Sequence, residues 1–252
     1  MEKNQSELLL ATCLLAGKIM ISSGSETYRV EDTVKHIAQS AGVSDEDVFT
    51  LPTGIFISDR QNSMMQQRAI FERITNLSKI HEVNRLSRQF AEKKLTLQEL
   101  NRRLKAVAQK CKSYSLGFQL LGAAVISFTM VPICTQHFKL NAMLIAAVAG
   151  LFGYYVNHSV DRLFKISFFS QLSAAFVIGM VSNFCFHYGL IAHPGGVVIG
   201  AVMPLVPGVA ITNAFRDLLA GHLLTSVAHG LEALFCAATI GTGIALAFHF
   251  GL

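Results

Sequence analysis

The chain of 252 residues lacks the sequence patterns of the common enzyme classes. It has no phosphate-binding loop, no G-x-G-x-x-G after an expected strand and no Ser-His-Asp set, which argues against catalysis and against ATP-driven work by this chain alone. Its five cysteines form no C-x-x-C pair, so neither a zinc site nor a disulfide framework is expected. Four of the cysteines lie in apolar helical contexts, where cysteine behaves as a small buried hydrophobe. We therefore expect no enzyme, no cofactor and no metal.

Charge is scarce in the second part of the chain. The charged residues after position 112 are Lys139, Asp161, Arg162, Lys165, Arg216, Asp217 and Glu232, and residues 1–112 hold all the others. A charge-rich segment of this length is typical of one domain in water, whereas long apolar runs are typical of membrane helices. The expected fold class is therefore an α+β cytoplasmic domain over residues 1–112, followed by an all-α transmembrane bundle of five helices over residues 113–252.

The first part shows mixed periodicity. Residues 7–22 are apolar nearly all round, which predicts a buried core helix rather than a signal peptide. Pro52-Thr53-Gly54 predicts a kink or a hairpin corner inside a strand segment. Thr96-x-x-Glu99 is a capping box that opens a helix. The expected elements are helices over 7–22, 26–41, 77–90 and from Thr96 toward Lys112, and strands over 48–58 and 66–74.

The gaps between charges set the expected membrane spans. A spanning helix needs about 20 apolar residues. The expected spans are 114–134, 140–157, 165–188, 195–212 and 225–250. Basic residues favour the cytoplasmic side, and this orientation leaves Lys139 as the one basic residue outside. The pattern therefore predicts a bacterial inner-membrane protein with a cytoplasmic N-terminus and an external C-terminus. The same rule explains the basic stretch before residue 113 better than a nucleic-acid partner does.

The fourth expected span carries an interruption that a simple anchor does not need. Pro204, Pro207 and Gly208 break the apolar run, and polar residues follow at once. A broken helix frees backbone N–H and C=O groups, which need partners inside a membrane. Breaks of this kind line the polar sites of secondary transporters. The interruption therefore predicts a discontinuous helix beside a polar site.

Two segments then show a family resemblance. Ser23-Gly-Ser-Glu-Thr-Tyr-Arg-Val-Glu31, followed by Leu51-Pro-Thr-Gly54, resembles the amino-terminal domain of the threonine/serine exporter family. Met203-Pro-Leu-Val-Pro-Gly-Val-Ala-Ile-Thr-Asn-Ala-Phe-Arg-Asp217 with Gly221-His222 resembles the membrane motif of that family. The family alanine after Ser-Gly is Ser25 here. The resemblance implies the larger, five-span subunit of the split two-subunit type, similar to the succinate exporters of enteric bacteria, with a smaller membrane subunit as partner and an oligomeric assembly.

Arg216 is the leading substrate-binding candidate, because a guanidinium matches a carboxylate with two hydrogen bonds. Its alternative role is an anchor at the membrane surface paired with Asp217. Asp217 is expected to hold Arg216 in place or to carry a proton. Asn213 offers a donor and an acceptor, and Thr212 lies beside it. The half-helix start after Gly208 suits an anion.

Two further groups are candidates. His229 and Glu232 share one helical face, and Asp217, Glu232 and His229 are the proton-coupling candidates. Polar packing between helices is the plainer role for His229 and Glu232. The cytoplasmic motif is expected to form either a site or a gate under the pore, or a structural turn with surface ion pairs. It comprises Glu26, Arg29, Glu31, Thr53 and Gly54.

The function predicted from these patterns is export of small carboxylated metabolites, either serine and threonine or a dicarboxylate such as succinate, by secondary transport coupled to protons. Two alternatives stay open. One is a membrane-anchored enzyme with its site in the soluble domain, which leaves the broken span unexplained. The other is a non-transporting subunit that positions a partner.

Overall fold

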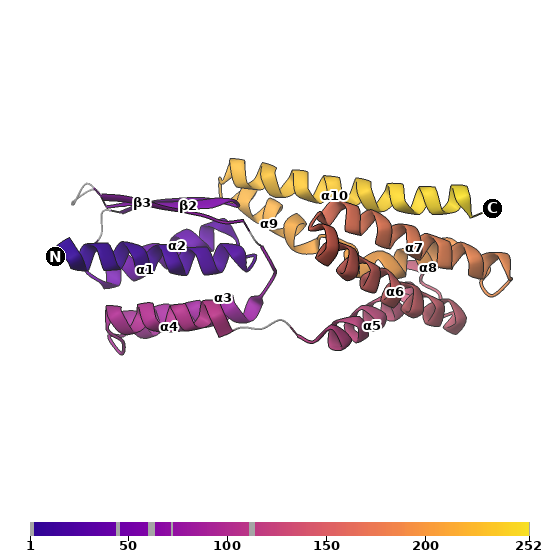
Figure 1. Ribbon diagram of the computed structural model, residues 1–252, viewed down its shortest axis with the longest axis horizontal. Coiled ribbons are helices and arrows are strands. Elements are labelled where there is room, and N and C mark those ends of the chain that lie inside the picture. The colour runs from indigo at the N-terminus through magenta and orange to yellow at the C-terminus, as the bar shows by residue number, and fades with distance from the viewer. Residues whose placement is uncertain (1–2, 44–45, 60–63, 72, 111–113, 252) are drawn as a thin grey trace. The chain divides into compact units, whose positions relative to one another are not determined.

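The computed structural model describes residues 3–43, 46–59, 64–71, 73–110 and 114–251, and most of them are helical (Figure 1). The chain divides into two compact units. The first unit is Met1–Ser113 with Val209–Leu231, and the second is Tyr114–Gly208 with Glu232–Leu252. The later segment of the first unit carries the polar residues that follow the proline break.

The first unit has three layers, a sheet, a middle helix pair and an outer helix pair (Figure 1). Its helices are α1 (Lys3–Ser22), α2 (Thr27–Ser40), α3 (Leu77–Ala91) and α4 (Leu97–Lys110). Its strands are β1 (Glu46–Leu51), β2 (Gly54–Asp59) and β3 (Met64–Ala69), which pair antiparallel in the order β1-β2-β3. The segment Pro52-Thr53-Gly54 is a hairpin corner, with Leu51 opposite Gly54. Thr96 caps α4 by accepting from the Glu99 N–H at 3.2 Å.

Helix α1 forms the centre of this unit. It packs against α2, α3, α4 and the strands β2 and β3, so neighbours cover it on several sides. Large aliphatic side chains such as Leu9, Leu14 and Ile19 are buried there. A Cβ on Gly17 would lie 2.3 Å from Ile55 Cδ1, so glycine is what lets α1 approach β2. The all-round apolar character of residues 7–22 therefore reflects burial in a protein core.

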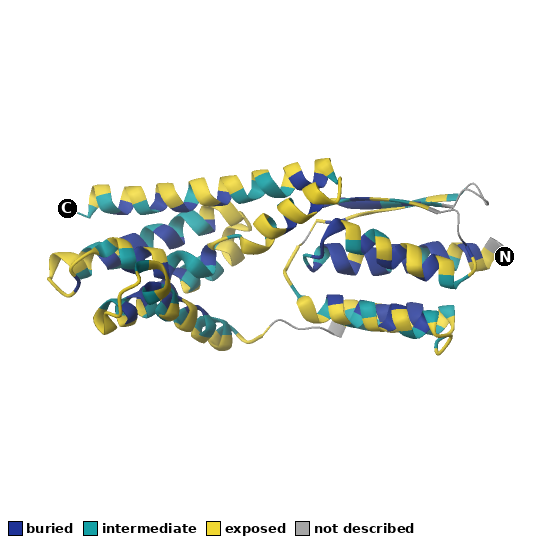
Figure 2. Ribbon diagram, turned by 180° about the vertical axis from the view of Figure 1, so that it is seen from behind, coloured by how far each residue is buried: buried dark blue, intermediate teal, exposed yellow. Residues whose placement is uncertain are grey.

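The second unit is built from long apolar helices that hide small residues and expose large ones. Its elements are α5 (Leu116–Thr135), α6 (Leu140–Phe164), α7 (Ser167–His187), α8 (Pro194–Val202), the 3-10 turn η1 (Met203–Leu205) and the later part of α10 (Leu223–Phe250). Buried positions include Ala146, Ala149 and Ala174, while Phe118, Leu121 and Phe152 are exposed. Figure 2 shows the exposed and half-buried residues along these helices. This distribution suits a lipid environment, where close helix packing depends on small residues.

Several glycines of the second unit mark close approaches between helices. A Cβ on Gly150 would lie 2.0 Å from Ser127 Oγ, and one on Gly153 would lie 2.5 Å from Ile178 Cδ1. A Cβ on Gly200 would lie 2.9 Å from the Ser127 carbonyl oxygen. Gly117 and Gly122 have open space instead. Glycine is therefore a packing requirement at some of these positions and not at others.

Five helices among the described residues are long and apolar enough to cross a membrane. They are Asn4–Ser22, Leu116–Thr135, Leu140–Phe164, Ser167–His187 and Leu223–Phe250. In the first helix 61% of the most apolar 18-residue window is buried inside the protein, whereas the share is 17–33% in the other four. Helix α1 therefore has little apolar surface left to contact lipid. The helix pair Pro194–Leu205 and Gly208–Leu219 also passes when taken together, with a bend of 67° at the break.

The predicted fold class is wrong. The described part of the chain is mainly helical and contains one sheet of three short strands, and within it no distinct α+β cytoplasmic domain is followed by a five-helix bundle. The reason is the polar segment after the break. The expected bundle included residues 209–231, but these residues pack with the first unit, where Asn213, Arg216 and Asp217 contact the turn before α2 and its first residue.

Candidate functional site

The break in the fourth apolar segment has a local cause. Helix α8 tightens into the 3-10 turn η1, and Val206 then adopts an extended conformation with ψ 130°. A residue before proline is disfavoured in the helical region, and Pro207 follows Val206 directly. Pro204 lies in the first turn of η1, where its missing N–H costs little. Helix α9 (Gly208–Leu219) begins directly after Pro207.

Helix α9 packs its polar face against the rest of the first unit. Asn213 and Asp217 are four residues apart, so they share a face, and both are buried. Thr212 and Arg216 are exposed neighbours. Although most residues of α9 are apolar, the residues that it buries against protein are the polar ones, Asn213 and Asp217.

Asp217 caps helix α2 from 190 residues away. Its carboxylate accepts from the Thr27 backbone N–H at 3.0 Å and from the Thr27 hydroxyl at 3.1 Å. The N-cap residue of α2, Glu26, makes no side-chain cap of its own. A negative charge at a helix N-terminus also interacts favourably with the helix dipole. Asp217 is fully buried, so both bonds are shielded from water.

Asn213 fixes the turn that precedes α2. Its side-chain amide donates to the Gly24 carbonyl at 3.2 Å. Gly24 has φ +84°, a left-handed conformation that only glycine adopts without strain. The Ser-Gly-Ser turn is therefore held by a side chain that follows the proline break.

Glu26 and Arg216 form the charged part of the same cluster. Arg216 Nη1 donates to Glu26 Oε1, while Arg29 Nη1 lies 3.4 Å from Glu26 Oε2. The Glu26 side chain is 9% exposed, but that of Arg216 is 53% exposed. Burial by itself raises the pKa of Glu26, yet its own backbone N–H and the two guanidinium groups outweigh burial and lower that pKa. The Arg216 side chain is thus accessible from outside the protein while it binds Glu26.

A second polar contact to α2 lies about one turn farther along this helix, at Glu31. Helix α9 ends in a Schellman motif: the Gly221 N–H bonds the Leu218 carbonyl, and the His222 N–H bonds the Asp217 carbonyl at 2.8 Å. Gly221 has φ +85°, as this motif requires. His222 Nδ1 then lies 3.9 Å from Glu31 Oε1. Burial raises the pKa of Glu31, and His222 and Lys35 offset this only in part.

The structure thus brings together Glu26, Arg29, Glu31, Asn213, Arg216 and Asp217. Sequence reasoning paired Asp217 with Arg216, but their observed partners are Thr27 and Glu26. It also missed Thr27, whose backbone N–H bonds to Asp217 because the N-cap residue Glu26 provides no side-chain cap. We call these residues with Thr27, Gly24 and His222 the motif cluster.

The other candidates lie elsewhere. Thr53 and Gly54 form the β1–β2 corner and line a separate cavity of 330 Å³ with Phe56 and Arg68. His229 and Glu232 are half-buried on α10, one turn apart. The motif cluster therefore contains part of the predicted site, while the remaining residues belong to other surroundings.

Four long apolar helices with large exposed side chains, together with an apolar segment that is interrupted at its prolines, are the features of a helical membrane protein. The model of the threonine/serine exporter family matches residues 11–251. The chain belongs to this family, whose members are transporters and not enzymes.

A named relative supports the assignment. The chain is 23% identical over 233 residues to a Mycobacterium tuberculosis protein named a probable threonine/serine exporter. The match covers 90% of this chain but 43% of that relative, so the chain spans less than half of the relative's length. No solved structure matches.

Proposed function

We propose that this chain is an inner-membrane exporter subunit for small carboxylated metabolites, either serine and threonine or a dicarboxylate such as succinate. The observation that carries the proposal is the meeting of the two family-like segments in the motif cluster, where Arg216 and Asp217 contact Glu26 and Thr27. The excess of Lys and Arg in residues 1–112 supports a cytoplasmic N-terminus and an external C-terminus.

The proposed recognition step is an exchange of carboxylates on Arg216. The Arg216 side chain is half exposed, and its guanidinium already binds one carboxylate, that of Glu26. A substrate carboxylate presents the same planar pair of oxygens and can replace Glu26. Arg29 then retains Glu26, so the displaced carboxylate keeps a counter-charge. Asn213 and Asp217 hold the turn in place during the exchange, and Thr212 offers a further hydroxyl on the exposed side of α9.

We further propose that export is coupled to protons. Asp217, Glu232 and His229 are the proposed members of the proton route, the last two because polar groups are costly in an apolar helix. Pro204, Pro207 and Gly208 provide the interruption that lets polar groups approach the path.

The proposed exporter includes a smaller membrane subunit of the same family. The aligned region covers 43% of the M. tuberculosis relative, which therefore extends well beyond it. We propose that a partner subunit provides the equivalent part and that the two subunits assemble as an oligomer.

Counterflow in proteoliposomes tests the function. The full chain is reconstituted with and without the partner, and uptake of labelled serine, threonine and succinate is measured. We expect flux with the pair and a loss of flux of about 100-fold for Arg216→Ala, because a bidentate charged contact to substrate is removed. Arg216→Lys should recover only a small part, since lysine cannot form the planar fork.

Arg162→Ala is the matched control, because Arg162 is also an exposed arginine but lies in the last turn of α6, outside the motif cluster. Its flux should equal that of the wild type. Normal flux through a well-expressed Arg216→Ala protein would remove the site assignment, and absence of flux for all three substrates with the partner present would remove the function.

A further inference from the structure

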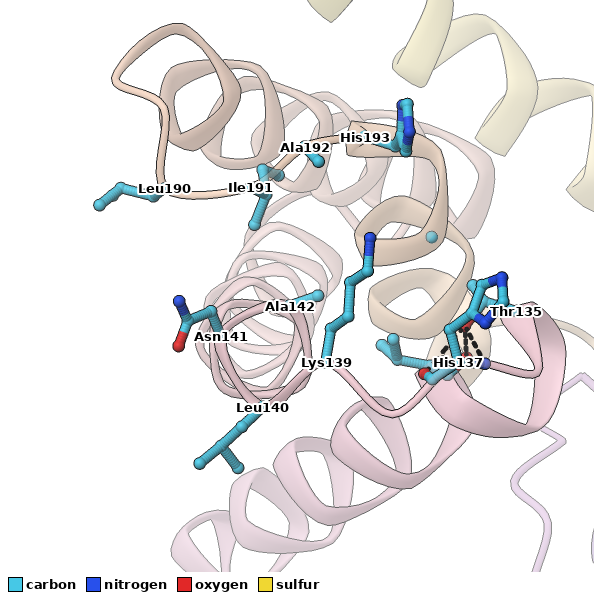
Figure 3. A pocket seen from close by; sticks show the side chains of 12 residues that line it. Thr135, His137, Lys139, Leu140, Asn141, Ala142, Leu190, Ile191, Ala192 and His193 are labelled. Carbon is cyan, nitrogen blue, oxygen red and sulfur yellow. Dashed lines mark hydrogen bonds between the residues drawn. The ribbon is translucent and has the colours of Figure 1, made fainter.

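The second unit contains a cavity of 450 Å³ that the motif cluster does not involve. It lies where the α5–α6 loop and the α7–α8 loop meet the starts of α6 and α8 (Figure 3). Twelve residues line it, and none of them is acidic. Its polar side chains are those of Thr135, His137, Lys139, Asn141 and His193.

The charge in this cavity is positive and uncompensated. Lys139 reaches from the start of α6 toward the loop that carries His193, as Figure 3 shows. Among the described residues, no carboxylate lies within ion-pair distance of the Lys139 ammonium. The acidic residue of α6, Asp161, lies 22 positions along the same helix, or about 33 Å at 1.5 Å per residue. That separation exceeds the screening length of roughly 8 Å in physiological salt.

The backbone adds to the positive character. Lys139 and His193 are the N-cap residues of α6 and α8, and neither side chain caps its helix. The first-turn N–H groups of a helix lack partners within the helix and carry partial positive charge. Two helix starts therefore face the same cavity as the ammonium group and the two imidazoles, His137 and His193.

The remaining lining is apolar and includes Val131, Leu140 and Ile191. A small ligand with an anionic end and a short carbon skeleton matches both parts of the lining. The volume is within the usual range for small-molecule sites, about 300–1,000 Å³. A bare inorganic anion would leave the apolar wall without a contact.

We infer that this cavity binds the anionic oxygen group of a small organic acid, with Lys139 as its principal contact and His137 and His193 as additional donors. The inference deepens the proposed function: in the proposed orientation the cavity faces the outside, where it would hold substrate during release. A phospholipid headgroup carries the same anionic oxygen chemistry, so the experiment includes lipid arms that separate the two sources.

Binding of labelled succinate to the purified full chain tests the inference. The chain is placed in nanodiscs of neutral phosphatidylcholine, and the dissociation constant is measured by scintillation proximity. Lys139→Gln should weaken binding about tenfold or more, because it removes a charge-assisted hydrogen bond. Lys139→Arg should stay within a few-fold of the wild type. Lys165→Gln is the matched control, since Lys165 caps the opposite end of α6, and it should bind as the wild type does.

A fluorescent reporter locates the ligand. The chain contains no tryptophan, so Leu190→Trp places the only indole at the cavity wall and Leu163→Trp places it near the far end of α6. Succinate should change the emission of the first protein saturably and leave that of the second unchanged. The response should disappear when Lys139→Gln is added to Leu190→Trp.

Each outcome has one meaning. Equal succinate affinity in Lys139→Gln and the wild type, or a response only at position 163, overturns the inference. If anionic phosphatidylglycerol changes the position-190 emission and blocks succinate, the site binds anions and a lipid headgroup is a natural source. Binding at Lys139 without counterflow by the subunit pair leaves the cavity site standing and removes the exporter function, whereas counterflow without such binding does the reverse.

Discussion

The two units of this chain are built in opposite ways. The first unit buries large aliphatic residues such as Leu14, Ile37 and Ile55 and, apart from Glu26 and Asp217 in the motif cluster, keeps most of its charges on the surface. The second unit buries mainly alanine, glycine and serine and exposes phenylalanine and leucine. Water drives large apolar groups inward, whereas lipid gives them no such drive and rewards close backbone contact. Apolar composition alone therefore does not locate a membrane helix, because α1 and α5 are both apolar but only α1 is covered by protein on most sides.

Leucine truncation gives the largest expected difference between the units. Leu14→Ala should destabilise the protein by about 2–5 kcal/mol, because it leaves a cavity in the core around α1. Leu121→Ala removes the same atoms from an exposed position on α5 and should cost less than about 1 kcal/mol. Thermal unfolding in detergent measures both. Equal destabilisation would contradict the inverted burial of the two units.

Glycine replacement probes the packing of the second unit. Gly150→Ala should destabilise by about 1–3 kcal/mol, because the new Cβ would overlap Ser127 Oγ. Gly122→Ala meets open space in a helix and should stabilise by up to about 1 kcal/mol. The same unfolding assay compares them. A neutral Gly150→Ala would show that these helices are not in close contact there.

Loss of the cap that Asp217 provides to α2 should destabilise the first unit, although Asp217 lies far along the chain, after the proline break. Asp217→Ala leaves the buried Thr27 N–H without its acceptor, which costs about 1–3 kcal/mol. Hydrogen exchange should show faster exchange at the first turn of α2. Asp161→Ala, on α6, is the control and should leave exchange in α2 unchanged. Unchanged exchange in Asp217→Ala would mean that α9 does not cap α2.

The smallest expected effect is a pH dependence from Glu31. Burial raises its folded pKa above the ordinary value of 4.5, so its contribution to stability is present below that value and is lost as pH rises through the folded pKa. Glu31→Gln should therefore remove a small fall in melting temperature between about pH 4.5 and neutral pH. An identical pH profile in both proteins would show that Glu31 is not buried as described.

The sequence predicted local elements better than their assembly. The buried helix, the hairpin corner and the break at Pro207 follow from residues close together in the chain, through apolar pattern and proline geometry. The fold class was mispredicted because the contacts of Asn213 and Asp217 with Gly24 and Thr27 join segments about 190 residues apart. Periodicity carries no information about such partners.

The candidate site shows the same division. Arg216 and Asp217 were recognisable because charge is rare in an apolar stretch. Their partners were not, since Glu26 and Thr27 lie in a polar segment where such residues are ordinary. The cavity around Lys139 was missed because it depends on two loops meeting, although the isolation of this lysine among apolar residues was a visible signal.

The central claim is that Glu26 and Arg216 contribute to export through their mutual ion pair. A double-mutant cycle on counterflow tests this claim most directly. Glu26→Gln, Arg216→Gln and the double variant are reconstituted with the partner subunit, and flux of the transported acid is compared with the wild type. The account predicts that the double variant loses no more flux than the more impaired single variant, because the two residues share one interaction. Losses that multiply in the double variant, or singles with normal flux, would contradict it.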